Sequence, residues 1–184
     1  MSSTATKPIT ANDLLKMGDI GRCELIYGEL IMMSPAGAEH GVVAMRLGAF
    51  LNAFVAQHAI GVVFAAETGF KIASNPDLVR APDASYVRKD RLAGGLTRGY
   101  FDGVPDIAVE VLSPDDRTRE VAEKIAMWLA HGTQVVWEAD PRTMTVIIHR
   151  VGQPPQRLGI DDTLREVSLL AGFELPLSKV FTLL

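Results

Sequence analysis

Apolar residues recur at helical spacing in two long segments, and these segments predict the main helices. The first covers residues 39–58 and ends before Gly61, with its apolar positions on one face: Val43, Leu47, Phe50, Leu51 and Phe54. The second is predicted to begin at Ser113-Pro114, with a capping serine and a proline at the first helical position. It is expected to end near His131-Gly132.

Short apolar runs between the helices predict strands over residues 62–65, 69–73, 84–87, 107–112, 134–137 and 143–150. Residues 24–33 predict two further strands folded at Tyr27-Gly28, and Thr10 can cap a short helix to about Met17. The tail from Pro176 is expected to dock as a short apolar helix. This order predicts a single α/β domain over residues 1–184, with a central mixed sheet, helices on both faces, an N-terminal β-hairpin and a loosely attached segment at residues 1–20.

Composition narrows the class of protein without identifying its chemistry. With 184 residues, 48% of them hydrophobic and 22% charged, the chain is typical of one globular domain. A net charge of -4 argues against strong non-specific binding to nucleic acid or to acidic membranes, although it allows a local basic patch. The single cysteine, Cys23, excludes an internal disulfide framework. Neither a signal peptide nor a membrane-spanning segment is evident, so we expect a cytoplasmic protein without a membrane partner.

One acidic residue lies inside an apolar run. In Asp106-Ile-Ala-Val-Glu-Val-Leu112 the central Glu110 falls in a buried strand, where an unpaired carboxylate would cost several kcal/mol. A basic side chain, a proton or a metal ion could each satisfy it. Asp106 shares its face of the strand but lies about 13 Å away, which is too far to share one metal. Asp83 follows Pro82 and opens the strand at residues 84–87, so it could meet Glu110 across the sheet and complete a site for Mg²⁺ or Mn²⁺ with water and a substrate phosphate.

Lys124 lies on the second predicted helix, at the edge of the inward face that Val121, Ile125 and Trp128 define. A lysine in this position could extend into solvent or reach the carboxylates at the end of the strand.

Asp83, Glu110 and Lys124, in this order, resemble the PD-(D/E)XK nuclease superfamily. Within it the chain is similar to the Uma-two (Uma2) family, described as restriction endonucleases. The similarity spans most of the chain from about Glu24 to Phe181, and its matching stretches are Glu24-Leu-Ile-Tyr-Gly-Glu-Leu30, Met33-Ser-Pro35, His40, Pro82-Asp83, Pro105-Asp106, Glu110-Val-Leu-Ser-Pro114, Lys124 and Gly172-Phe173.

The resemblance implies a restriction-endonuclease-like core and a metal-dependent endonuclease that hydrolyses DNA phosphodiester bonds. Asp83 and Glu110 would hold Mg²⁺ or Mn²⁺, and Lys124 would orient the attacking water or stabilise charge on the phosphate. His40 would be an accessory ligand.

Two positions depart from the pattern. Leu112 stands where the superfamily motif has its lysine, so the role of Lys124 depends on a migration of that lysine to the following helix. In Gln134-Val-Val-Trp137, many relatives carry an acidic residue before the aromatic pair.

Other functions stay open at this point. A Glu110–Lys124 ion pair without metal would satisfy both charges, and the chain would then be a nuclease-fold binding or assembly module without catalysis. A metal-dependent hydrolase of RNA or nucleotides is a further alternative. A local excess of basic residues, among them Arg80, Arg88 and Lys89, either contacts a DNA backbone or forms a solvated loop. A homodimer is also open, because nucleases that cut both strands often work as dimers.

Overall fold

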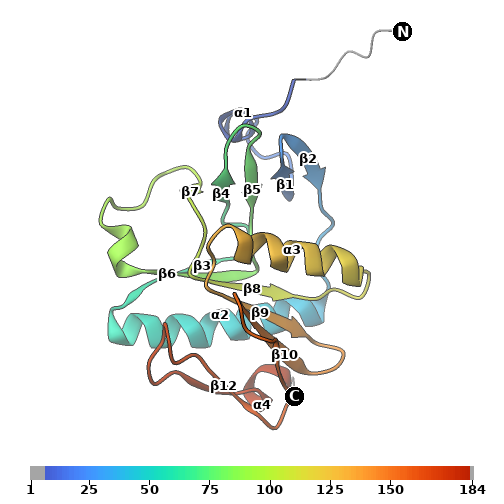
Figure 1. The fold of residues 1–184 in the computed structure, drawn as a ribbon. Helices are drawn as coiled ribbons and strands as arrows, with labels where there is room; N and C mark the ends of the chain where they lie inside the picture. Colours follow the sequence, from blue (N-terminus) through green and yellow to red (C-terminus); the bar gives the residue numbers. More distant parts are fainter. Residues whose placement is uncertain (1–6, 183–184) are drawn as a thin grey trace.

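The computed structural model describes residues 7–182, which fold around two β-sheets (Figure 1). The larger sheet has six strands in the order β11 (Gln156–Leu158), β10 (Thr145–Arg150), β9 (Val135–Asp140), β8 (Ile107–Val111), β6 (Ala84–Arg88) and β3 (Gly61–Ala65). The smaller sheet has five strands in the order β2 (Glu29–Met32), β1 (Cys23–Ile26), β5 (Leu78–Arg80), β4 (Phe70–Ala73) and β7 (Phe101–Asp102). A separate pair consists of β12 (Thr163–Arg165) and β13 (Glu174–Pro176).

The two long helices cover opposite faces of the larger sheet (Figure 1). They are α2 (Ala38–His58) and α3 (Thr118–Ala130); the short helices are α1 (Ala11–Lys16), the 3-10 helix η1 (Lys89–Leu92) and α4 (Ser178–Phe181). In the larger sheet β8 and β9 run parallel while the other pairs are antiparallel, so the sheet is mixed. This architecture confirms the predicted α/β fold. Within the described residues, no helix is long and apolar enough to span a membrane.

Strand β8 divides its side chains between the two faces. Its five residues are all buried, and successive side chains of a strand point to opposite sides. Val109 packs in the core that α2 covers, whereas Ala108 packs in the core beneath α3. Glu110, two residues after Ala108, therefore points to the α3 side, and so does Asp106, two residues before it.

The smaller sheet packs on the α3 side of the molecule, because the Phe70 ring meets the Trp128 ring edge-on with centroids 6.4 Å apart. Its other surface is covered by the N-terminal segment. Ala11 and Leu14 are buried against the smaller sheet, and the Ala11 N–H donates to Asp77 Oδ2 at 2.7 Å. This part of the predicted loosely attached segment therefore packs on the smaller sheet, and residues 1–6 lie outside the described residues.

Local signals located most elements correctly. Thr10 caps α1 in a capping box with Asp13, and the predicted hairpin turns at Tyr27 and Gly28 with φ of 50° and 83°. The predicted start of α3 is wrong, since the helix begins at Thr118. The Ser113 N–H instead donates to the Asp116 carboxylate at 2.7 Å, which closes a turn before the helix.

Candidate active site

Glu110 is buried under α3, and both of its carboxylate oxygens have donors. Trp128 Nε1 donates to Oε1 and Lys124 Nζ donates to Oε2, each at 2.7 Å. Both donors come from one helix, four residues apart, so a single face of α3 supplies them. Burial raises the pKa of Glu110 from its usual 4.5 to about 7, against the attraction of Lys124 and with added repulsion from Asp83. Lys124 therefore offsets only part of the free-energy cost of burying the charged Glu110 carboxylate.

Asp83 lies beside Glu110 across the strand pair. Ala84 on β6 is opposite Val109 on β8 and forms the last pair of this ladder, so Asp83, directly before β6, lies at the strand end beside Glu110. Two backbone bonds fix this geometry: the Asp83 N–H donates to the Val109 carbonyl at 2.9 Å, and the Val111 N–H donates to Asp83 Oδ2 at 2.8 Å. The Asp83 carboxylate also repels the charged form of Glu110, so the two carboxylates are near neighbours.

His40 holds the second carboxylate in place from the first turn of α2. Its Nε2 lies 3.2 Å from Asp83 Oδ2, and both side chains are buried. The hydrogen bond that His40 donates to Asp83 raises the pKa of His40. Burial would raise the pKa of Asp83, but the hydrogen bond and charge of His40 lower it overall. His40 thus lies within the predicted site and contacts it through Asp83.

Glu24, on β1 of the smaller sheet, is a third buried carboxylate at this site. Its Oε1 lies 3.6 Å from Lys124 Nζ, so the lysine bridges Glu24 and Glu110. Burial would lower the pKa of Lys124, but Glu110 and Glu24 raise it overall, and Lys124 stays charged. The local sequence does not predict a role for Glu24 at this site. The available signal was an acidic residue directly beside an apolar run that opens the predicted hairpin.

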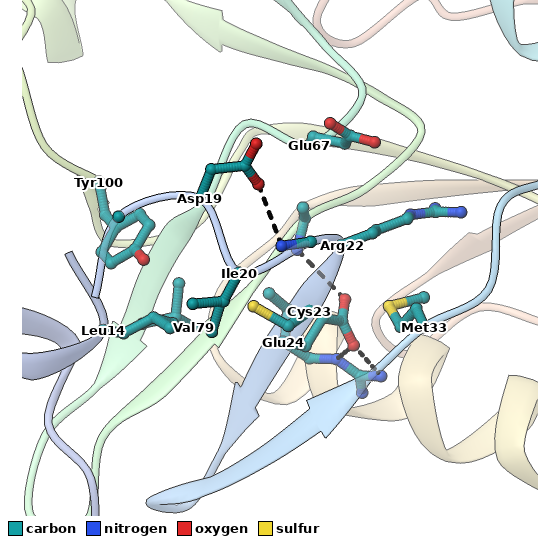
Figure 2. A pocket seen from close by; sticks show the side chains of 15 residues that line it. Leu14, Asp19, Ile20, Arg22, Cys23, Glu24, Met33, Glu67, Val79 and Tyr100 are labelled. Carbon is teal, nitrogen blue, oxygen red and sulfur yellow. Dashed lines mark hydrogen bonds and ion pairs between the residues drawn. The ribbon is translucent and has the colours of Figure 1, made fainter. Parts of the chain in front are cut away.

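Arg80 is bound to Glu24 rather than free. Its Nε and Nη2 both lie 2.8 Å from Glu24 Oε2, and the following Ala81 N–H donates to Oε1 at 3.2 Å. Glu24 and Arg80 both line a cavity of about 260 Å³, and Figure 2 labels Glu24 on its wall. Burial would raise the pKa of Glu24, but Lys124 and Arg80 lower it. Whether Arg80 also contacts nucleic acid stays a prediction.

The other predicted basic residues lie near Asp106, at the far end of β8 from Glu110. The Arg88 N–H donates to Asp106 Oδ2 at 2.9 Å, and its Nε lies 3.4 Å from Oδ1. Lys89 is exposed at the start of η1. Gln134, the position that departs from the family pattern, donates to Asp106 Oδ1 at 3.0 Å. The departure at Gln134 therefore does not touch Glu110 or Asp83, and the nucleic-acid contacts of Arg88 and Lys89 stay predictions.

The carboxylates fit a cation that brings most of its own ligands. Within residues 7–182, no group of three or more His, Cys, Asp and Glu side chains is arranged to hold a metal ion. Mg²⁺ ordinarily binds through one or two carboxylates and keeps waters or substrate phosphates as its other ligands. Asp83 and Glu110 supply two carboxylates on neighbouring strands, and the raised pKa of Glu110 reflects a charge that a cation would stabilise. An ion at Glu110 requires Lys124 to move, and Glu24 is the adjacent acceptor for its ammonium.

Comparison with known proteins shows which family the chain belongs to. A family model described as "Putative restriction endonuclease", named Uma2, matches residues 11–178. The chain belongs to the Uma2 family. No curated protein is significantly similar to it. Among solved structures, it resembles the crystal structure of a "putative nuclease belonging to DUF820" from Anabaena variabilis, with 25% sequence identity and a TM-score of 0.79. The match covers 95% of this chain and 98% of that one. Membership in the Uma2 family confirms the resemblance seen in the sequence and places the chain among nuclease-like proteins.

Proposed function

We propose that this Uma2 protein is a divalent-metal-dependent endonuclease that hydrolyses DNA phosphodiester bonds. The observation that carries the proposal is the pair of neighbouring carboxylates of Asp83 and Glu110, with Lys124 Nζ 2.7 Å from Glu110. Two adjacent carboxylates and a charged amine at a strand end are the groups that metal-assisted phosphodiester hydrolysis requires. The family and the solved relative support a nuclease; the metal and the DNA substrate are the proposed refinements.

Each residue has a distinct role in this proposal. Asp83 and Glu110 hold Mg²⁺ or Mn²⁺, which when bound acts as a Lewis acid on the phosphate and lowers the pKa of the attacking water. Lys124 keeps its proton because of Glu110 and Glu24, so it serves as a cation that orients water or stabilises phosphate charge. His40 fixes the orientation of the Asp83 carboxylate.

The direct experiment measures cleavage of supercoiled plasmid, linear duplex and single-stranded DNA with Mg²⁺, with Mn²⁺ and with a chelator. We expect cleavage only with metal, and loss of cleavage in Asp83→Asn. Calorimetric titration with Mn²⁺ should show weaker binding by Asp83→Asn than by the wild type. Wild-type protein that cuts no DNA form with either metal would contradict the proposal. RNA and nucleotide substrates in the same assay test the alternative hydrolase.

A second candidate, a nuclease-fold module without catalysis, also has a specific observation in its favour. The Lys124–Glu110 pair at 2.7 Å satisfies both charges without metal. Its other motivation is weaker, because Gln134 contacts Asp106 rather than Glu110. Calorimetry separates the two candidates: no heat of Mn²⁺ binding to the wild type favours the module.

A further inference from the structure

A cavity of about 880 Å³ lies beside Asp83 on the α2 side of the larger sheet. Its volume is within the range of small-molecule binding sites. Small residues of α2, including Gly41, Ala44 and Gly48, line one wall, and Phe64 of β3 lines another. The chemistry proposed above uses only Asp83 and His40 of this cavity, so its large apolar wall has no assigned ligand.

Arg22 lies where this cavity meets the smaller one. It lines both of them, and its side chain is 24% exposed. Its Nη2 is 3.6 Å from Asp83 Oδ1, which is an ion pair but longer than a hydrogen bond. Figure 2 shows the Arg22 side chain extending away from the Glu24–Arg80 pair. Among the residues lining the two cavities, Arg80 is already paired with Glu24 at 2.8 Å, whereas Arg22 pairs with Asp83 at the longer distance of 3.6 Å.

We propose that the larger cavity binds the nucleoside next to the scissile phosphate, while Arg22 binds that phosphate. This inference rests on the proposed nuclease function and specifies how its substrate is held. A phosphate entering a site with Glu24, Asp83 and Glu110 needs a cationic donor at its edge. A guanidinium presents paired N–H groups that match phosphate oxygens, and Arg22 is the arginine beside Asp83.

The cavity wall suits the apolar faces of a sugar and a base. Met32 and Met45 are well exposed at the cavity, and Met33 also lines it. Methionine side chains adapt their shape and contact aromatic rings favourably, so they accept different bases. The charged and apolar parts of the site thus match those of a nucleotide. Arg22, near the carboxylates, matches the phosphate, and the apolar wall along α2 matches the sugar and base.

The chain offers variants that test each half of the site without unfolding it. A Cβ built at Gly41 meets nothing within 4 Å, and Gly41 lines the larger cavity, so Gly41→Phe is expected to fill part of that cavity. Gly41→Ala is the matched control at the same helical position. Arg22→Gln removes the phosphate donor. Arg165→Gln is its charge-matched control. Arg165, on β12, is exposed and pairs with Glu174 of the neighbouring strand.

The probes are thymidine monophosphate and inorganic phosphate, titrated by calorimetry in metal-free buffer. We expect the nucleotide to bind the wild type about tenfold more tightly than phosphate. Gly41→Phe should erase this preference, while Gly41→Ala keeps it. Arg22→Gln should weaken both probes by about tenfold, and Arg165→Gln should weaken neither. Equal affinity of the wild type for both probes, or unchanged nucleotide binding in Gly41→Phe, would overturn the inference.

These outcomes are separable from failure of the nuclease itself. Protein that binds the nucleotide as described but cuts no DNA contradicts the nuclease and supports the nucleotide site. Protein that cuts DNA with the same KM in the wild type, Arg22→Gln and Gly41→Phe contradicts the nucleotide site and supports the nuclease.

Discussion

Strand β8 carries two buried acids on one face, and their surroundings differ. At its start, Asp106 accepts hydrogen bonds from the Arg88 backbone at 2.9 Å and from Gln134 at 3.0 Å. Arg91 Nη1 lies 3.1 Å from the same carboxylate. Side chains and backbone from several segments thus surround Asp106 with donors.

At the other end of the face, Glu110 meets a second carboxylate as well as its donors. Asp83 lies beside it, and Lys124 contacts both Glu110 and Glu24. The comparison teaches that burial of an acid does not by itself mark a reactive site. What distinguishes Glu110 is that several buried carboxylates share the single ammonium of Lys124. Their negative charge is therefore available to stabilise a second cation.

The largest expected difference between the two ends is in catalysis. Glu110→Gln should lower the rate of metal-dependent DNA cleavage by about a thousandfold, because it removes a charged ligand with little change in shape. Asp106→Asn should leave the rate per folded molecule unchanged. Plasmid nicking with equal amounts of folded protein, checked by circular dichroism, measures both. Equal losses in the two variants would remove the distinction.

We expect a metal ion to be able to replace the Lys124 ammonium at Glu110, whereas the hydrogen-bond donors around Asp106 should stay in place. Lys124→Met removes the ammonium that competes for Glu110, so Mn²⁺ affinity should rise by roughly tenfold, about 1.4 kcal/mol. Cleavage should nevertheless fall by about a hundredfold, because the cation that orients water or stabilises the phosphate is lost. Calorimetry and nicking assays report the two effects separately. Weaker Mn²⁺ binding in Lys124→Met would contradict this account.

The raised pKa of Glu110 predicts a pH dependence of stability. Between its ordinary 4.5 and about 7, the folded protein binds this proton more strongly than the unfolded chain does. The contribution of Glu110 to the free energy of unfolding therefore falls as pH rises through this window, by up to about 3 kcal/mol, and is constant above it. The difference in unfolding free energy between wild type and Glu110→Gln, measured by urea denaturation with a chelator, isolates this contribution. A difference that rises with pH would have the wrong sign.

The smallest effect concerns the structural end of the strand. Asp106→Asn should lower the free energy of unfolding by about 2 kcal/mol, because the substitution weakens hydrogen bonds to a buried, charged carboxylate. Asp90 is the matched control: it also pairs with Arg88, but its side chain is 68% exposed. Asp90→Asn should change stability by less than about 0.5 kcal/mol. Urea denaturation of both variants tests this, and an equal loss in the two would show that burial of Asp106 adds nothing.

Much of the candidate site follows from local sequence. The charge of Glu110 inside an apolar run and the Pro82-Asp83 step before a strand were enough to predict their pairing. The helical face of Val121, Ile125 and Trp128 then placed Lys124 at its edge. Side-chain direction in a strand or helix is set by its period, so these local patterns indicate the faces on which Glu110 and Lys124 lie.

The rest depended on contacts between distant segments. Glu24 meets Arg80 and Lys124, which are remote in sequence, so no local pattern links them. Strand β5 has three residues, too few for an alternation to be recognised. Ser113-Pro114 matches a helix start locally, but the competing bond from the Ser113 N–H to Asp116 delays α3 to Thr118.

The division of the site between two sheets has a consequence for how such proteins diversify. Arg22 and Glu24 come from the hairpin of the smaller sheet, while Asp83, Glu110 and Lys124 are held by the larger sheet and α3. The hairpin packs mainly on α1 and β5, outside the core that α2 covers. Substitutions in the hairpin can therefore change Arg22 and Glu24 without altering the core that α2 covers.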